Sequence, residues 1–192
     1  MPTTAVPLLL TDPGYLLWAP VLTAFPTNTV VASVFTDAWA GAYISLGATE
    51  DGSEFTYATK LEAVMVAEFF DPIRWSTTER SGSFAFTLVN WTLTQWKKAM
   101  NGGTLTIVSG TTTTTLTSFT PPAPGGEVRA TLGWESTDAT TRLLVPQCIN
   151  GTEIKSKFAK APAKAGIACE FQFEIPTSTF PFTLFSAGVA RG

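Results

Sequence analysis

The sequence predicts a mainly β fold, a β-sandwich or barrel with one short flanking α-helix. Apolar and polar residues alternate over long stretches, and this period of two residues is typical of half-buried strands. Turn-forming pairs such as Asp71-Pro72 and Asn150-Gly151 separate these stretches. Aromatic residues make up 12% of the chain, and they recur in the alternating stretches together with β-branched residues, as is typical of strands.

The amino-acid composition excludes several classes of protein. Only 14% of the 192 residues are charged, against about 25% in an ordinary globular domain, so we expect much of the surface to be buried between copies of the chain. Histidine is absent, which excludes Ser-His-Asp and Cys-His catalysis and every metal site that needs a histidine. The net charge of −3 argues against binding of nucleic acid through clustered cations.

Neither a targeting signal nor a membrane segment is expected. The first seven residues carry no basic group, and the short apolar run that follows stops at Thr11, so the pattern of a signal peptide is missing. No stretch approaches the roughly 18 apolar residues of a membrane span. We therefore expect assembly in a cytoplasm, with Cys148 and Cys169 as free, buried thiols rather than a disulfide.

The N-terminal 36 residues are predicted to be an extended arm that docks on a neighbouring subunit. This segment is too rich in proline for a regular core element. Its prolines are Pro2, Pro7, Pro13, Pro20 and Pro26. Residues 37–192 are then expected to form a single β domain.

Strands of this domain are predicted wherever the alternation is strong. From Phe55 to Phe70 the odd positions are almost wholly apolar. From Ile167 to Ile175 the odd positions are again apolar and are expected to face the core, with polar residues on the solvent side. Further strands are expected at Ala40 to Leu46, Ser83 to Val89, Thr104 to Val108, Thr112 to Phe119, Glu127 to Glu135, Thr141 to Val145 and Phe182 to Phe185.

One hairpin and one helix carry clear local signals. Asn150-Gly151 predicts a type I′ turn, because both central residues of that turn need a positive φ. Thr92 is the predicted N-cap of a short helix, with Gln95 returning a hydrogen bond to the amide of Thr92. Asn101-Gly102-Gly103 ends the helix. The helix is expected to pack on the β core through one face, formed by Leu93, Trp96 and Met100.

The polar residues predict no catalytic, cofactor-binding or metal-binding site. Glu170 and Glu174 share a strand face but stand four residues apart, about 13 Å, beyond the carboxylate spacing of glycosidases. Glu50, Asp51 and Glu54 lack the spacing of a calcium loop and are interpreted as a solvated acidic turn. A basic cluster is interpreted as a solvated or subunit-contacting segment rather than a phosphate site. It comprises Lys155, Lys157, Lys160 and Lys164.

Six tryptophans leave a sugar-binding platform open as an alternative, because sugars stack on exposed aromatic faces. Trp96 is expected on the side of the helix that faces the core. Trp91 and Trp134 are expected on the side of the sheet that faces the core. Protein interfaces use the same amphipathic side chains as sugar platforms. The less constrained candidates for either role are Trp18, Trp39 and Trp75.

Several motifs follow one another in a recognisable order. The run from Leu46 to Tyr57 reads LGATEDGSEFTY, and Phe70 to Arg74 reads FDPIR. A polar strand with Glu79-Arg80, then Asn90-Trp91, and the helix that ends at Asn101-Gly102-Gly103 come next. Arg142 to Gln147 (RLLVPQ), an Asn-Gly pair and a final alternating strand complete the set. In this order, over about residues 40–185, the motifs resemble those of the major tail tube proteins of long-tailed bacteriophages.

The resemblance implies a structural virion protein with neither enzymatic activity nor a cofactor. In that family a tail-tube β-sandwich flanked by one helix forms hexameric rings, which stack into the hollow conduit of a long flexible tail for genome ejection. Strands that line the lumen are expected to include parts of Tyr43 to Leu46, Phe55 to Phe69 and Phe84 to Val89. A long loop between two of them contacts the next ring. By position, this inter-ring stacking loop is expected at Ala48, Thr49, Glu50, Asp51, Gly52, Ser53 and Glu54.

The resemblance also implies partners and a location. The partners are further copies of the chain, a tape-measure protein, tail-end proteins, and double-stranded DNA that passes through without specific binding. Six chains of net charge −3 repel a polyanion rather than bind it. The location is the tail of the virion, after assembly in the cytoplasm of the host bacterium, with no membrane partner. The alternatives are a ring-forming tube protein of a bacterial secretion system and a sugar-binding β-sandwich.

Overall fold

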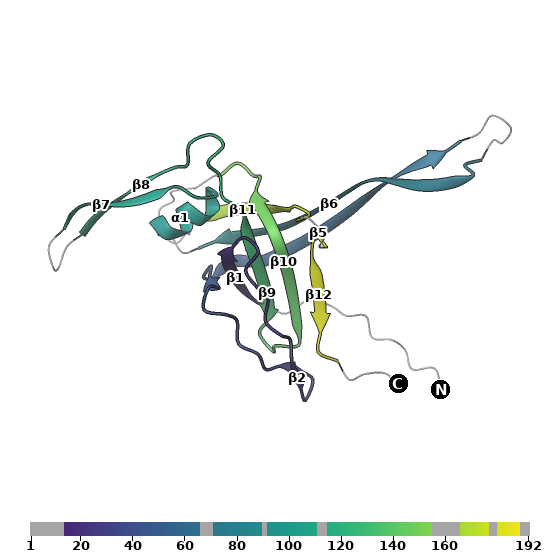
Figure 1. Ribbon diagram of the computed structural model, residues 1–192, viewed down its shortest axis with the longest axis horizontal. Helices are drawn as coiled ribbons and strands as arrows, with labels where there is room; N and C mark the ends of the chain where they lie inside the picture. The colour runs from purple at the N-terminus through teal and green to yellow at the C-terminus, as the bar shows by residue number, and fades with distance from the viewer. Residues whose placement is uncertain are drawn as a thin grey trace.

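The computed structural model describes residues 14–65, 71–89, 92–110, 115–154, 166–176 and 180–188 of the chain. Within these ranges the protein is mainly β and contains one short helix, α1 (Leu93–Ala99) (Figure 1). The strands are β1 (Gly14–Pro20), β2 (Val30–Val31), β3 (Val34–Phe35), β4 (Ile44–Ser45), β5 (Thr49–Val64), β6 (Arg74–Leu88), β7 (Thr104–Gly110), β8 (Thr115–Thr120), β9 (Ala130–Ser136), β10 (Thr141–Asn150), β11 (Ile167–Phe173) and β12 (Thr183–Ser186).

The main sheet is antiparallel and has eight strands, in the order β4-β1-β9-β10-β11-β6-β5, with β12 paired to β10. Strand β10 belongs to both halves of this sheet. Its residues 141–145 lie between β9 and β12, whereas residues 148–150 pair with β11. Between these halves, Pro146 and Gln147 face only Thr131 of β9, in a β-bulge. A bulge is where a strand tolerates proline, because proline cannot donate a ladder hydrogen bond.

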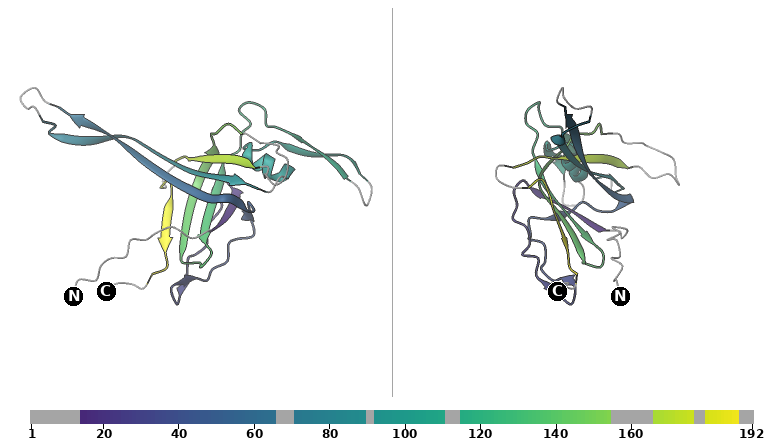
Figure 2. Two further views of the ribbon diagram at one scale, coloured as in Figure 1. Left: turned by 180° about the vertical axis from the view of Figure 1, so that it is seen from behind. Right: turned by 90° about the vertical axis from the view of Figure 1, so that its right-hand side faces the viewer.

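The two halves of the sheet enclose one hydrophobic core. Strands β11, β6 and β5 run across β1, β9 and β10 in the views of Figures 1 and 2. Apolar side chains from both halves meet in a single cluster, to which α1 adds Ala99. Its most buried members are Leu46, Leu88, Ala99, Val145, Cys148, Ile167 and Phe171. The predicted fold class, mainly β with one short helix, is confirmed.

Two β-ribbons extend from this body at opposite ends of the molecule (Figure 1). The first is the outer part of the β5–β6 pair, residues 57–65 and 73–82, and is called the long arm below. The second, called the short arm, is formed by β7 and β8 and contacts α1 at its base. The left view of Figure 2 shows the same opposite arrangement from behind.

Most of the predicted strands are confirmed, with shifted ends. Strand β5 begins at Thr49, before the predicted start, and residues 66–70 of that prediction lie outside the described residues. The prediction for Ala40 to Leu46 is wrong except at Ile44 and Ser45, because the Tyr43 N–H donates to the Ala40 carbonyl (2.9 Å) in a turn. Ile175 lies beyond the end of β11 and is 70% exposed, so its predicted place in the core is also wrong.

The segment predicted as an extended N-terminal arm contains a strand of the main sheet. All seven residues of β1 pair with β9, and β1 also pairs with β4. The β domain therefore begins before residue 37, and for this part the predicted arm is wrong; residues 1–13 lie outside the described ranges. The prolines do not prevent the strand, because Pro13 precedes it and Pro20 is its last residue.

The predicted hairpin turn at Asn150-Gly151 does not form. Asn150 ends β10, and its buried side chain donates to the Ala99 carbonyl (2.7 Å) and accepts from the Glu170 N–H (3.0 Å). The backbone N–H and C=O of Asn150 pair with the side-chain amide of Asn101, both at 2.8 Å. The prediction is wrong because Asn150 fastens the end of α1 to the sheet, while β11 begins only at Ile167.

Helix α1 is capped as predicted but buries a different face. The Thr92 hydroxyl accepts from the Gln95 N–H (3.2 Å). The Gln95 side chain does not return to Thr92, because its Nε2 donates to the Leu46 carbonyl (2.8 Å) and so ties the helix to the end of β4. The buried helix positions are Gln95, Lys98 and Ala99. The predicted packing residues Leu93, Trp96 and Met100 are half-buried, and Trp96 packs against the core.

A buried arginine fastens the chain between β1 and β4 onto the sheet. Arg142 of β10 is only 1% exposed. Its Nη2 donates to the Asp37 carbonyl (2.6 Å), its Nη1 donates to Asn28 Oδ1 (3.1 Å), and its Nε forms an ion pair with Glu135 of β9. Because these donors point in three directions, one side chain holds residues 28–37 against β9 and β10. The guanidinium also lies over the rings of Phe35 and Trp39.

The substitution Arg142→Lys is expected to lower the free energy of unfolding by about 3 kcal/mol, because an ammonium cannot reach three diverging acceptors and leaves buried polar groups unpaired. Urea denaturation followed by tryptophan fluorescence measures the change. The matched control is Arg80→Lys on the exposed long arm, for which we expect a change of no more than about 0.5 kcal/mol. Equal effects of the two substitutions would contradict the fastening role of Arg142.

Candidate functional site

The predicted stacking loop is part of a strand in the structure. Residues 49–54 begin β5 and pair with the end of β6. The pairs Thr49–Leu88 and Ser53–Phe86 enclose three residues on β5 but one on β6, so the stretch bulges at the edge of the sheet. Gly52 in this bulge has a φ of +82°. The expected loop is thus corrected to a bulged edge strand, and its contact with a neighbouring ring stays a prediction.

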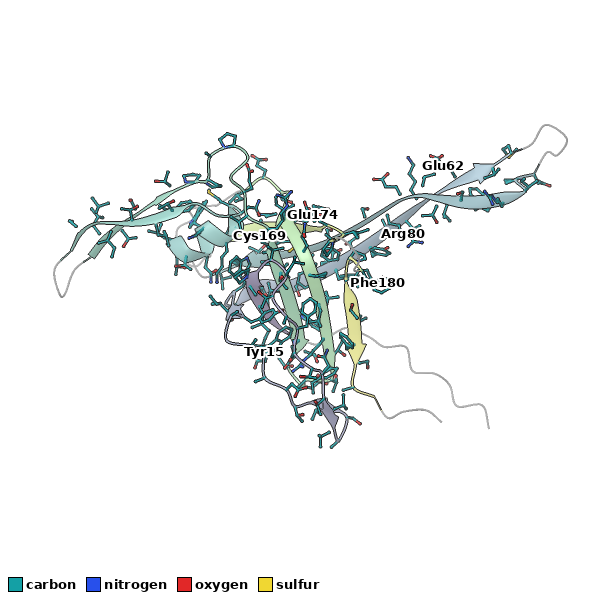
Figure 3. The ribbon with its side chains drawn as sticks, viewed as in Figure 1. Tyr15, Glu62, Arg80, Cys169, Glu174 and Phe180 are labelled. Atoms are coloured by element: carbon teal, nitrogen blue, oxygen red, sulfur yellow. The ribbon has the colours of Figure 1, made fainter. Side chains whose placement is uncertain are left out.

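One face of the sheet formed by β5, β6 and β11 is polar and is called the polar face below. Residues that pair across strands share a face, and neighbours along a strand alternate. The even positions of β5 lie on this side together with their partners on β6 and β11. Figure 3 shows Glu62 of this face and Arg80 on opposite sides of the long arm. The described charged members of the polar face are Glu54, Lys60, Glu62, Arg74, Glu79 and Glu170.

The opposite face of the long arm is mainly apolar and begins in an aromatic cluster at the body. The ring of Phe182, just before β12, lies 4.9 Å from that of Phe55 and 5.0 Å from that of Tyr57, centroid to centroid. Phe173 of β11 joins them at 5.8 Å from Phe55. Gly82 makes this packing possible, because a Cβ there would stand 2.5 Å from the Phe173 ring. The root of the arm is therefore covered by the body.

Beyond that root the apolar face of the long arm is largely exposed in the part of the chain that the structure describes. The Thr59–Arg80 pair separates the root from the outer end of the arm. At the outer end, Leu61 and Trp75 lie on this face and are 52% and 63% exposed. The sequence predicts an almost wholly apolar face from Phe55 onward but does not reveal whether that face is covered. The length of β5, 16 residues, is the signal that part of the strand leaves the body. The exposed apolar residues of the arm's outer end, called the outer patch, are Leu61, Met65, Ile73 and Trp75.

The short arm also carries apolar side chains that the chain leaves exposed. At its base, Leu105 and Phe119 pair across the strands and are half-buried. Toward its end, Ile107, Val108 and Leu116 are 70%, 59% and 57% exposed. The sequence from residue 104 to residue 120 contains no charged residue. Hydroxyl side chains dominate its remaining positions.

A shallow depression of about 360 Å³ lies on the polar face, beside the bulge of β5. Glu54 and Glu170 line it, together with small residues of β6 and β11. The Glu170 carboxylate already accepts hydrogen bonds from the Thr152 hydroxyl (3.1 Å) and the Gln172 amide (3.0 Å). Among the described residues no group of three or more acidic or cysteine side chains is placed to hold a metal ion.

The carboxylates Glu170 and Glu174 do not act as a pair, because each has its own partners. Arg129 holds Glu174 through two hydrogen bonds, Nε to Oε2 (2.9 Å) and Nη2 to Oε1 (3.3 Å), and the Gln147 amide donates a third (2.6 Å). These hydrogen bonds hold the pKa of Glu174 below its usual value, and the largest contribution comes from Arg129. The four lysines of the basic cluster lie outside the described residues.

The tryptophans that the structure describes do not form a shared platform. Trp134 is in the core as expected, whereas Trp91 lies outside the described residues. Trp39 donates to Glu135 (2.7 Å) and packs over Gly133, where a Cβ would stand 2.5 Å from its ring. Trp75 is on the long arm. Trp18 is half-buried against the core, with Lys98 Nζ 5.6 Å from its ring centroid.

Both cysteines are free and buried, as expected. Burial raises the pKa of the Cys169 thiol to about 12, and burial also raises the pKa of the Cys148 thiol. Neither thiol is therefore a nucleophile at neutral pH. They act as small apolar members of the core, in which both are found.

Comparisons with known proteins add no relative. No protein-family model and no curated protein matches this sequence. In the part of the chain that the structure describes, no helix has the length and apolar character to cross a membrane.

The substitution Gly82→Ala is expected to lower the free energy of unfolding by about 1–3 kcal/mol, because the added methyl group collides with the ring of Phe173. Thermal or urea denaturation measures the change. The control is Gly41→Ala, where nothing lies within 4 Å of the new methyl group and the loss of chain entropy in the unfolded state favours alanine slightly. If Gly82→Ala is as stable as this control, the root of the arm is not packed as described.

The substitution Glu174→Gln is expected to destabilise the protein by at most about 1 kcal/mol at pH 7, because it removes the ion pair with a half-exposed Arg129. A pKa that is lowered by folding stabilises the folded state above the unfolded pKa, and this stabilisation is lost as pH falls through the folded pKa. The difference between wild type and variant should therefore shrink on acidification, in melting curves recorded from pH 7 to pH 3. A pH-independent difference for Glu174→Gln would contradict this assignment.

Proposed function

We propose that the chain is a structural subunit that assembles with copies of itself into rings stacked as a tube, the role of the major tail tube proteins that its sequence resembles. The observation that carries this proposal is the uncovered outer patch of the long arm. It continues, beyond the Thr59–Arg80 pair, the same face that the body covers at the root. The low charged fraction of the chain, 14%, supports the same conclusion, because extensive contacts between copies bury few charges.

The outer patch is energetically unfavourable in an isolated chain. A two-stranded ribbon on its own is marginally stable in water, and this one exposes a tryptophan, a leucine, an isoleucine and a methionine. Covering one such side chain stabilises a complex by about 1.5–3 kcal/mol. Contact with another subunit therefore supplies both the cover for the arm and the free energy for assembly.

The edge of the main sheet offers a second means of assembly. Strand β5 is the last strand in the sheet order, so its outer edge pairs with no strand of the described chain. A long free edge invites pairing with a strand of another molecule. In a ring, each free edge is paired by the next subunit, and the sheets close into a barrel without an edge.

The polar face supplies a suitable lining for a conduit. Its described charged residues are four carboxylates and two basic groups, a net charge of −2. Double-stranded DNA carries one negative charge per ~1.7 Å, and a wall of this sign does not bind it. We therefore assign the polar face to the lumen, and the long arm's apolar face to contacts between subunits.

Replacing Leu61 and Trp75 together by serine should abolish assembly, because the subunit contact loses two of its apolar side chains. Negative-stain electron microscopy and light scattering of the purified full chain, up to about millimolar concentration, measure the assembly. Wild type is expected to form rings or tubes, and the double variant a monomer with an unchanged circular dichroism spectrum.

The matched control replaces Lys60 and Arg74, which neighbour those positions on the polar face, by serine. This control should assemble like the wild type. A wild-type chain that stays monomeric at every concentration would overturn the proposal, and so would a double variant that assembles normally.

A further inference from the structure

We infer that the outer patch of the long arm is covered by the short arm of a second copy of this chain. This inference rests on the proposed function and names the two surfaces that meet. The contact joins Leu61 and Trp75 of one molecule to Ile107 of the other's short arm, on the face of that arm that Leu105 and Phe119 share.

The chemistry of the two surfaces matches. The short arm has no charged residue between positions 104 and 120, so burying it in a contact leaves no charge without a partner. On the apolar face of the long arm the charged residue of the described pairs is Arg80, whose guanidinium can donate to hydroxyls and carbonyls of a threonine-rich ribbon. A polyanion is not the expected partner, because the short arm carries no cation to bind it. A highly charged protein surface is not expected either, because its charges would lose their hydration against the apolar side chains of the two arms.

The placement of the arms makes the contact intermolecular. They leave the body at opposite ends, so those of one molecule cannot meet (Figure 1). Both arms nevertheless run along the same diagonal in Figure 1 and in the left view of Figure 2. A second copy displaced along this diagonal therefore brings its short arm alongside the first copy's long arm.

The symmetry of this contact follows from its two different surfaces. Each molecule contributes a long arm on one side and a short arm on the other, which makes the contact heterologous. Repetition of such a contact leads to a ring when the rotation between copies closes, and to a filament when it does not. A self-complementary contact between two long arms would instead stop at a dimer.

Cysteine cross-linking of two single variants tests this arrangement. Ala63→Cys and Thr117→Cys proteins are changed at the cross-strand partners of Trp75 and Ile107, so that both apolar side chains stay in place. The two proteins are mixed, allowed to assemble and oxidised mildly, and the covalent dimer is quantified on non-reducing gels. The native thiols are buried at 0% and 3% exposure and should not react. The mixture should give about tenfold more covalent dimer than either variant alone, because only the mixture holds the two thiols together at high effective concentration.

The matched control mixes Ser81→Cys, on the polar face of the long arm, with Thr106→Cys, an exposed hydroxyl position of the short arm. This pair should give no more dimer than its single variants. Assembly with strong cross-linking of Ala63→Cys alone, or with equal yields in the test and control mixtures, would overturn the inference and leave the proposed function standing. Absence of any assembly in the wild type would overturn both.

Discussion

The β-bulge of β10 at Pro146 and Gln147 is the constraint on which the rest of the architecture depends. A residue without an N–H interrupts the ladder with β9, and the bulge that accommodates it separates two halves of one strand. One half lies between β9 and β12, and the other joins β11. Strands β11, β6 and β5 thereby lie across β1, β9 and β10, and the two halves of the sheet enclose the core. Strands β5 and β6 also extend past the body, where no second layer from the described residues is seen beside them.

The faces of the long arm follow from this exit. Near the body, aromatic rings of β11 and the chain before β12 complete the apolar side of β5 and β6. Farther out the odd positions of β5 stay mainly apolar, although the aromatic cover at the root has ended. The same pattern that builds a core at one end of the ribbon therefore leaves an exposed apolar surface at the other.

Local periodicity was sufficient to predict the fold class, most strands and the start of the helix. It could not predict features that depend on distant partners. Asn150-Gly151 has the composition of a tight turn, but the backbone N–H and C=O of Asn150 both pair with the side chain of Asn101, 49 residues earlier and just after α1. The prolines around β1 suggested an arm, because sequence does not reveal that β9 is available as a pairing partner. For the candidate site, the apolar positions were identified and their exposure was not, because exposure depends on where the second layer ends.

The two sealed thiols have a consequence for the covalent state of the subunit. Cys148 and Cys169 sit in the core with their protons held tightly, out of reach of oxidants and of thiols on other molecules. We therefore expect no disulfide to link neighbouring subunits when the surroundings change from reducing to oxidising. Any assembly of this chain would therefore be held by non-covalent contacts alone, and these contacts would be the same in a reducing and in an oxidising environment.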